Sequence, residues 1–382
     1  MESSRRSDVD PFIVMDVMEA ARKAEDAGRH IIHMEVGQPS TPAPKAARDA
    51  LAAAMEAGPL GYTVALGLPE LRQKIAALYT EWYGVDLDPG RVVVTAGSSA
   101  AFLLSFTALF DAGDRVGLAA PGYPSYRQIL KALSLEPVAI ESAAEHGFQP
   151  QPSDVSGLKG LIAASPANPT GTMLSAAELE GLSEACSAQG CAFISDEIYH
   201  GISYEDRCVS ALEVTDDVYV INSFSKYFSM TGWRIGWMVV PESHVRTVER
   251  LAQNMFICAP HASQVAAMGA LDGHAELQGH METYRANRRL LLDGLEAAGI
   301  KVISPADGAF YLYLDVSEVT DDSRSLASDI LDKAGVAVTP GLDFDAARGH
   351  QTLRLSYARA TADMEEGLSR LVAYFAGRAT AS

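Results

Sequence analysis

From residue 92 onward, short apolar and β-branched runs alternate with longer stretches of helical spacing. The runs that we interpret as strands are residues 92–96, 115–120, 158–164, 192–195, 218–222 and 235–240. Helical stretches lie between most of them, at residues 99–110, 125–132 and 175–189. This alternation is typical of a mostly parallel sheet, because parallel neighbours are joined by helical crossovers that cover both faces. The sequence therefore predicts an α/β fold with helices on both faces of a central sheet.

The flanking regions have a different pattern. Helical spacing recurs at residues 11–28, 244–254, 262–296, 325–333 and 364–376, and strand-like runs occur at 309–314, 336–339 and 352–356. Gly28 is the expected C-cap of the first helix, and Gly273 is a possible break in the long one. We expect an N-terminal arm and helix packed on a small domain, a large domain with the sheet, and a small C-terminal α+β domain, at residues 1–42, 43–280 and 281–382 respectively.

Composition excludes several classes of function. The 30 Lys and Arg against 49 Asp and Glu give a net charge of -19, which opposes binding to nucleic acids and anionic membranes. No apolar stretch approaches the roughly 18 residues of a membrane span. The four cysteines have no CxxC spacing and are expected to be free thiols, with no metal site in the chain. These features predict a cytoplasmic protein.

Polar and aromatic residues follow the predicted strands. They are Gly97, Ser98 and Ser99, then Tyr123, Asn168, Asp196 and Tyr199, and finally Ser223, Ser225 and Lys226. Because ligands of open parallel sheets bind beyond the carboxyl ends of the strands, these residues are expected at one site. By itself, Gly97-Ser98-Ser99 is typical of an ordinary helix N-cap. Ser223, Ser225 and Arg234 add donors suited to the same anion, so the combination predicts a phosphate site.

Lys226 and Asp196 both lie at the ends of buried strands, where a charge is costly without a partner. A plain ion pair is one interpretation. A desolvated lysine can instead react with an aldehyde, and an aspartate can keep a ring nitrogen protonated. Pyridoxal 5'-phosphate carries an aldehyde, a ring nitrogen and a phosphate. In this interpretation Tyr123 stacks on the ring, and Asn168 and Tyr199 hydrogen-bond its phenolic oxygen.

Three motifs carry a family resemblance. They are S-F-S-K-x-x-S-M-x-G-x-R-I-G at 223–236, Asn-Pro-Thr-Gly at 168–171 and Asp-Glu-Ile-Tyr at 196–199. From about Val36 to Ala358 the chain resembles the fold-type I pyridoxal-phosphate enzymes, and specifically the class I/II aminotransferases similar to bacterial aspartate aminotransferases.

The resemblance implies a role for each matching residue. Lys226 would be the Schiff-base lysine and move the substrate proton, with Asp196 and Tyr199 completing the catalytic group. The phosphate would be held by Gly97, Ser98, Ser99, Ser223, Ser225 and Arg234. Tyr62 resembles the tyrosine that reaches the phosphate of a partner subunit, which implies a homodimer with shared sites. Gly37, Asn168 and Arg354 resemble the contacts to the substrate carboxylate, although the alternating strand around Arg354 alone favours a solvated surface arginine.

The resemblance implies transfer of an amino group between an L-amino acid and a 2-oxo acid in a ping-pong cycle. Dicarboxylate-specific relatives use a second arginine, which we cannot assign here, so aspartate, alanine, branched-chain and aromatic donors all stay open. The first alternative is a C–S β-lyase of the cystathionine type or a decarboxylase on the same scaffold. The second is a pyridoxal-phosphate-binding regulator, which the short segment before Val36 and the negative charge disfavour.

Overall fold

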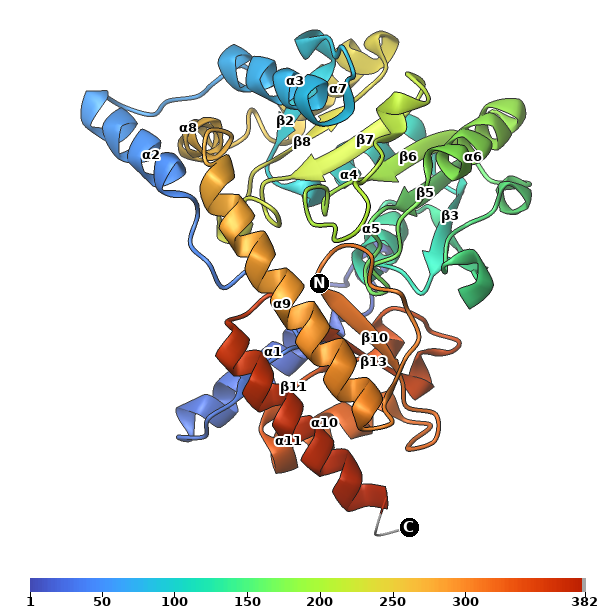
Figure 1. Ribbon diagram of the computed structural model, residues 1–382. Coiled ribbons are helices and arrows are strands. Elements are labelled where there is room, and N and C mark those ends of the chain that lie inside the picture. Colours follow the sequence, from blue (N-terminus) through green and yellow to red (C-terminus); the bar gives the residue numbers. More distant parts are fainter. Residues whose placement is uncertain (380–382) are drawn as a thin grey trace.

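The computed structural model describes residues 1–379 of the chain and contains a large seven-stranded sheet (Figure 1). The strand order is β2 (Val92–Thr95), β8 (Gly236–Val239), β7 (Tyr219–Ser223), β6 (Ala192–Asp196), β5 (Gly160–Ala164), β3 (Arg115–Ala120) and β4 (Glu136–Glu141). The pairs from β7 to β4 are parallel, and β8 is antiparallel to both of its neighbours. The predicted mostly parallel α/β fold is confirmed.

Both faces of this sheet are buried, which explains why its strands read as continuous apolar runs. One face packs on α4 (Ser98–Leu109), α5 (Pro124–Ala132) and α7 (Glu242–Met255). The other packs on α3 (Pro69–Tyr83), α6 (Ala176–Gln189) and α8 (His261–Ala270). Successive strand residues alternate between the two faces, as Val220 and Ile221 do.

A smaller four-stranded sheet lies below the first in Figure 1. Its order is β12 (Thr339–Pro340), β13 (Thr352–Ser356), β10 (Tyr311–Asp315) and β9 (Lys301–Val302), and all of its pairs are antiparallel. A separate parallel pair joins β1 (Ile32–His33) to β11 (Val336–Ala337). The accompanying helices are α1 (Ile13–Asp26), α9 (His274–Ala297), α10 (Ser323–Ala334) and α11 (Thr361–Ala379). The predicted run 336–339 is therefore two short strands that belong to different sheets.

Most other boundaries agree with the sequence to within three residues, and the break near Gly273 separates α8 from α9. The C-cap of α1 is Ala27, one residue earlier than the expected Gly28, which follows it with φ +85°. Two helices and three strands were missed: α2 (Lys45–Ala57), α3, the edge strand β4, and the two-residue strands β1 and β9. Across residues 1–379, no helix has the length and apolar character needed to cross a membrane.

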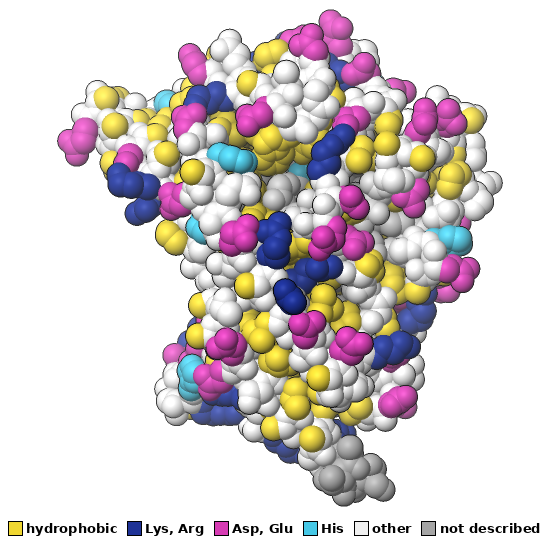
Figure 2. Space-filling view, in the orientation of Figure 1, with side chains coloured by type: hydrophobic (Ala, Val, Ile, Leu, Met, Phe, Trp, Pro, Cys, Tyr) yellow, Lys and Arg dark blue, Asp and Glu magenta, His cyan; other side chains and the backbone are white. Residues whose placement is uncertain are grey.

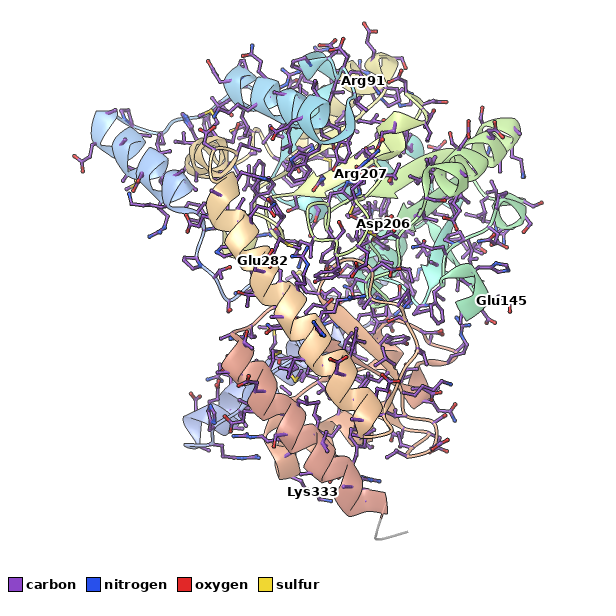
Figure 3. All side chains as sticks on the ribbon, viewed as in Figure 1. Arg91, Glu145, Asp206, Arg207, Glu282 and Lys333 are labelled. Carbon is purple, nitrogen blue, oxygen red and sulfur yellow. The ribbon has the colours of Figure 1, made fainter. Side chains whose placement is uncertain are left out.

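The side of the large sheet at the amino end of β2 carries structural contacts, whereas the side at the carboxyl ends of the parallel strands carries the predicted site residues. Arg91, labelled in Figure 3, lies at the amino end of β2, where it pairs with Asp216 and donates from Nε to the Val240 carbonyl at 3.0 Å. These bonds tie strand ends together. On the face shown in Figure 2, acidic and basic side chains are interspersed rather than segregated by sign. The carboxyl edge of the sheet instead collects the predicted site residues.

Candidate active site

Lys226 lies in the turn after β7, and its Nζ donates to the Gly37 carbonyl at 2.7 Å. Burial, together with the positive charges of Arg354 and Arg234, lowers the pKa of Lys226 to about 7, although Asp196 acts in the opposite direction. Near neutral pH a substantial fraction of this amine is therefore unprotonated and nucleophilic. This is the chemical state that the sequence predicts for Lys226.

Asp196 is the last residue of β6 and is 2% exposed. Its Oδ1 accepts from the Ile198 backbone N–H at 3.1 Å, and its Oδ2 accepts from the Tyr126 hydroxyl. Burial raises the pKa of Asp196 to about 6, although Tyr126, Ile198 and Lys226 favour the ionised form. Tyr126 was missed by the sequence interpretation; the available signal was its place one helical turn after Tyr123.

Three segments converge to form an anion cradle, which we define as Gly97, Ser98, Ser223, Ser225 and Arg234. Gly97 has φ +78°, and a Cβ on it would lie 2.4 Å from Nη2 of Arg234. Ser98 begins α4 and so presents the positive end of a helix dipole. The Ser223 hydroxyl donates to the Ser225 hydroxyl at 2.9 Å. These residues are brought together as expected, and glycine at 97 leaves room for the arginine.

Arg354 occupies the middle of the small sheet, between Tyr313 of β10 and Thr339 of β12, and is only 2% exposed. Its Nη1 donates to Oδ1 of Asn168 at 2.9 Å, and its Nη2 donates to the Glu35 carbonyl. Within residues 1–379, its buried Nε has no hydrogen-bond partner. The surface position suggested by the alternating strand is wrong, because both faces of this strand are covered.

Aromatic rings enclose Arg354 and join it to the neighbourhood of Lys226. The guanidinium lies 4.3 Å from the Tyr311 ring and 4.7 Å from the Phe344 ring. The Tyr311 hydroxyl is 2.7 Å from the Tyr199 hydroxyl, and the Tyr199 ring centre lies 5.5 Å from Lys226 Nζ. A Cβ on Gly37 would fall 1.6 Å from the Tyr311 hydroxyl, which explains the glycine. No local sequence pattern identified Tyr311 or Phe344 as residues of the site.

Comparison with known proteins decides the family. The family model described as aminotransferase class I and II matches residues 29–371. The chain belongs to this family. It is 46% identical to a valine–pyruvate aminotransferase of Mycobacterium tuberculosis over 96% of each chain. A crystal structure of an aminotransferase from Mycobacterium tuberculosis superposes with a TM-score of 0.95 at 45% identity, covering 98% of this chain and 99% of that one.

A more distant relative is the Thermus thermophilus aspartate aminotransferase with maleate, with a TM-score of 0.91, 31% identity and coverage of 97% and 99% of the two chains. The protein is therefore an aminotransferase, and the expected resemblance and enzyme class are confirmed. The relatives support this activity over the lyase alternative.

The N-terminal segment of the aminotransferase contacts Tyr123 through Phe12. The Phe12 ring meets the Tyr123 ring edge-on at 5.9 Å. On one side, Asp343 accepts the backbone N–H groups of Ile13 and Val14 at 3.2 and 3.1 Å, and so caps α1, whose N-cap residue has no capping side chain. On the other side, Asp10 exchanges two 3.0 Å hydrogen bonds with Gln128 of α5. We call residues 10–14 the strap.

Tyr62 is the expected site residue that lies apart from the others. It occurs in the connection between α2 and α3, and its side chain is 84% exposed. No hydrogen bond or ring contact described for residues 1–379 joins it to Lys226 or to the anion cradle. Within one chain of the aminotransferase, Tyr62 therefore has no place in the site.

Proposed function

We propose that this aminotransferase binds pyridoxal 5'-phosphate at Lys226 and transfers amino groups from apolar L-amino acids to 2-oxo acids such as pyruvate. The observation that carries the proposal is the placement of a lysine with a pKa of about 7 beside Asp196 and the anion cradle. A cofactor with an aldehyde, a basic ring nitrogen and a phosphate matches these three features. The 46% identity to a valine–pyruvate aminotransferase supports the choice of substrates.

The donor set fits the cofactor. Ser223, Ser225, Arg234 and the amino end of α4 supply hydrogen-bond donors for a dianion. The Tyr123 ring is available for stacking, and the Asn168 amide and Tyr199 hydroxyl lie near Lys226 and Arg354. The buried, unpartnered Nε of Arg354 is oriented for a further acceptor such as a substrate carboxylate. No residue of the proposed set opposes the fit.

When bound, the cofactor supplies an aldehyde that takes up the amino group and a ring that delocalises the charge left when the α-proton is removed. The protein contributes the remaining steps. Lys226 Nζ removes the α-proton and returns it to a neighbouring carbon, which a pKa near neutrality suits. Asp196 stabilises a proton on the ring nitrogen. Arg354 orients the substrate through its carboxylate.

The residues of the strap favour a substrate with an apolar side chain. Phe12 presents an aromatic ring beside Tyr123, and Phe344 covers Arg354. Asp10 of the strap is already paired with Lys131 at 3.0 Å, and Asp343 accepts the N–H groups of Ile13 and Val14, so neither aspartate offers a positive charge to a second substrate carboxylate.

The test of the proposal is a spectrum of the purified protein loaded with pyridoxal 5'-phosphate. We expect visible absorbance that borohydride fixes onto Lys226, located by peptide mapping. Addition of valine alone is expected to remove this absorbance and release one equivalent of its 2-oxo acid per site. Labelling of another lysine, or a preparation that stays colourless, would contradict the cofactor assignment. Release of pyruvate from a sulfur amino acid with the spectrum restored would instead support elimination.

Substitution of Tyr126 by Phe is expected to weaken cofactor binding by about 10- to 100-fold, because a hydrogen bond to a charged group is lost. Tyr126 lowers the pKa of Asp196, so its removal raises that pKa above about 6. Asp196 must be ionised to hold a ring proton. As the pH is lowered, Asp196 of the variant should therefore become protonated, and cofactor binding should be lost, at a higher pH than in the natural chain. Absorbance titrations of the cofactor between about pH 5 and 8 measure both effects. Identical midpoints in the two proteins would contradict this role.

Substitution of Phe12 by Ala is expected to lower kcat/KM for valine by about 10-fold, as for other losses of apolar contact in a binding pocket. Phe12→Leu is the matched control and should retain most of the activity. Phe12→Arg should raise kcat/KM for aspartate relative to valine. Steady-state kinetics with both donors measure the ratio, and an unchanged ratio in all three variants would exclude the strap from specificity.

We also propose that the chain acts as a cytoplasmic homodimer with the domain division expected at residues 42 and 280. Exposed apolar side chains occur on α2 (Met55), in the connection from α2 to α3 (Tyr62 and Val64) and between α7 and α8 (Ile257), as expected of an interface. Tyr62 would then reach the phosphate of the partner subunit. If so, mixed dimers of Lys226→Ala and Tyr62→Phe chains regain one intact site, whereas a site within one chain stays defective in both. Kinetics of refolded mixtures distinguish these outcomes.

A further inference from the structure

A pair of thiols lies at the end of β6 opposite the active site. Cys186 belongs to the last turns of α6, and Cys191 follows the helix directly. Gly190 adopts φ +61° and ψ 33°, the Cys191 N–H donates to the Cys186 carbonyl at 2.9 Å, and the Gly190 N–H donates to the Ser187 carbonyl at 3.2 Å. These hydrogen bonds define a Schellman motif, which brings its first and last side chains into contact.

Three other helices of this chain end with the same motif. In α1 the Arg29 N–H donates to the Ala24 carbonyl at 3.1 Å, in α5 the Leu135 N–H donates to the Leu130 carbonyl at 2.9 Å, and in α9 the Ile300 N–H donates to the Leu295 carbonyl at 2.9 Å. The pairs of α5 and α9 are aliphatic and buried, like the enclosed pair of α6. The geometry of the α6 pair is therefore ordinary, and the feature that differs is its chemistry.

Both cysteines are free thiols and are enclosed, with exposed fractions of 1% for Cys186 and 6% for Cys191. The neighbouring Cys186 lowers the pKa of Cys191, burial opposes this effect and Lys159 adds to it. The Cys191 Sγ lies 3.8 Å from the Ala192 carbonyl, to which it donates. Because Cys191 is also the more exposed of the two thiols, we expect it to react first, as the thiolate is the reactive form.

The two thiols line a cavity of about 450 Å³ between α6, the start of β6 and residues 214–217. Its charged lining residues are carboxylates, namely Glu180, Glu184 and Asp217. The acidic lining disfavours anionic oxidants such as glutathione disulfide, whereas a small neutral molecule is not repelled.

We propose that Cys186 and Cys191 form a dithiol that a small neutral hydroperoxide oxidises to an intramolecular disulfide. The Cys191 thiolate attacks one peroxide oxygen and the O–O bond breaks, which leaves a sulfenic acid and releases hydroxide or an alkoxide. The Cys186 sulfur then attacks the sulfenic sulfur, the S–O bond breaks and water leaves. The two thiols lose two electrons and two protons, and the peroxide is reduced to water, or to water and an alcohol. A reducing dithiol reverses the change.

The experiment treats the native, full-length protein with hydrogen peroxide, then blocks the remaining thiols with N-ethylmaleimide in denaturant and maps the peptides by mass spectrometry. We expect two fewer alkylated cysteines, a mass lower by about 2 Da before alkylation, and a Cys186–Cys191 cross-link that dithiothreitol removes. The double variant Cys208→Ala/Cys258→Ala should respond like the natural chain.

The single variants identify the order of attack. Cys186→Val preserves an apolar contact and should accumulate a sulfenic acid on Cys191 that dimedone traps, whereas Cys191→Val should react more slowly. A cross-link to Cys208 or Cys258, oxidation of Cys258 alone, or over-oxidation of single thiols without a cross-link would each overturn the proposal and leave the pair as an apolar helix-end contact. None of these readouts depends on the cofactor.

Discussion

Replacement of Lys226 by Ala is expected to reduce aminotransferase turnover by about 10²- to 10⁴-fold, because in the proposed mechanism this lysine moves the α-proton. No other amine is placed to substitute, since Lys226 Nζ is the one described lysine near the Tyr199 and Phe310 rings, at 5.5 and 6.0 Å. The anion cradle is unaltered by the change, so the variant should still bind pyridoxal 5'-phosphate noncovalently. Steady-state kinetics and equilibrium dialysis measure the two quantities.

Lys159→Ala is a matched control, because this lysine precedes β5 at the opposite edge of the sheet and should not affect turnover. An exogenous small amine should partly restore proton transfer to the Lys226→Ala variant, as it replaces the missing base. Full activity in that variant would contradict the assignment of the lysine. Loss of cofactor binding with intact folding would instead place most of the affinity in the covalent link rather than in the anion cradle.

The sequence predicted the large sheet and most of the proposed site for the same physical reason. Parallel strands end at one edge, so residues such as Asp196 and Lys226, which follow separate strands, are expected to lie close together. The local apolar pattern of each run was enough to locate the strand and the residues that follow it. The edge strand β4 was missed because Glu136, Pro137 and Glu141 make it a poor apolar run.

The remaining site residues depend on packing that no local pattern records. Tyr126 of α5 hydrogen-bonds to Asp196 of β6, and Tyr311 of the small sheet hydrogen-bonds to Tyr199, which follows β6. Asp343 caps α1, which lies about 330 residues earlier in the chain. Each contact joins elements that are distant in sequence, and each residue type is common in cores or turns. Arg354 shows the same effect: its alternating strand indicated an exposed arginine, but strands on both sides and aromatic rings above and below bury it.

Replacement of Arg354 by Lys is expected to lower kcat/KM for amino acid donors by about 30- to 1,000-fold. A buried charge that hydrogen-bonds to a charged ligand group contributes roughly 2–4 kcal/mol to the binding free energy. Lysine cannot reproduce the two parallel hydrogen bonds that the planar guanidinium of arginine donates to a carboxylate. The loss should appear mainly in KM, because we propose that Arg354 binds the carboxylate and that Lys226 performs the proton transfer. Steady-state kinetics with valine and its 2-oxo acid measure this separation.

A substrate without an α-carboxylate provides the decisive control. An apolar primary amine can react with the cofactor but offers nothing to Arg354, so the natural chain and the Arg354→Lys variant should process it at similar, low rates. An equal defect with the amine would mean that Arg354 acts through the structure around Asn168 and Tyr311. Unfolding is excluded as the cause if the cofactor spectrum and melting temperature of the variant match those of the natural chain. Selective loss with carboxylated donors therefore separates recognition of the substrate from support of the fold.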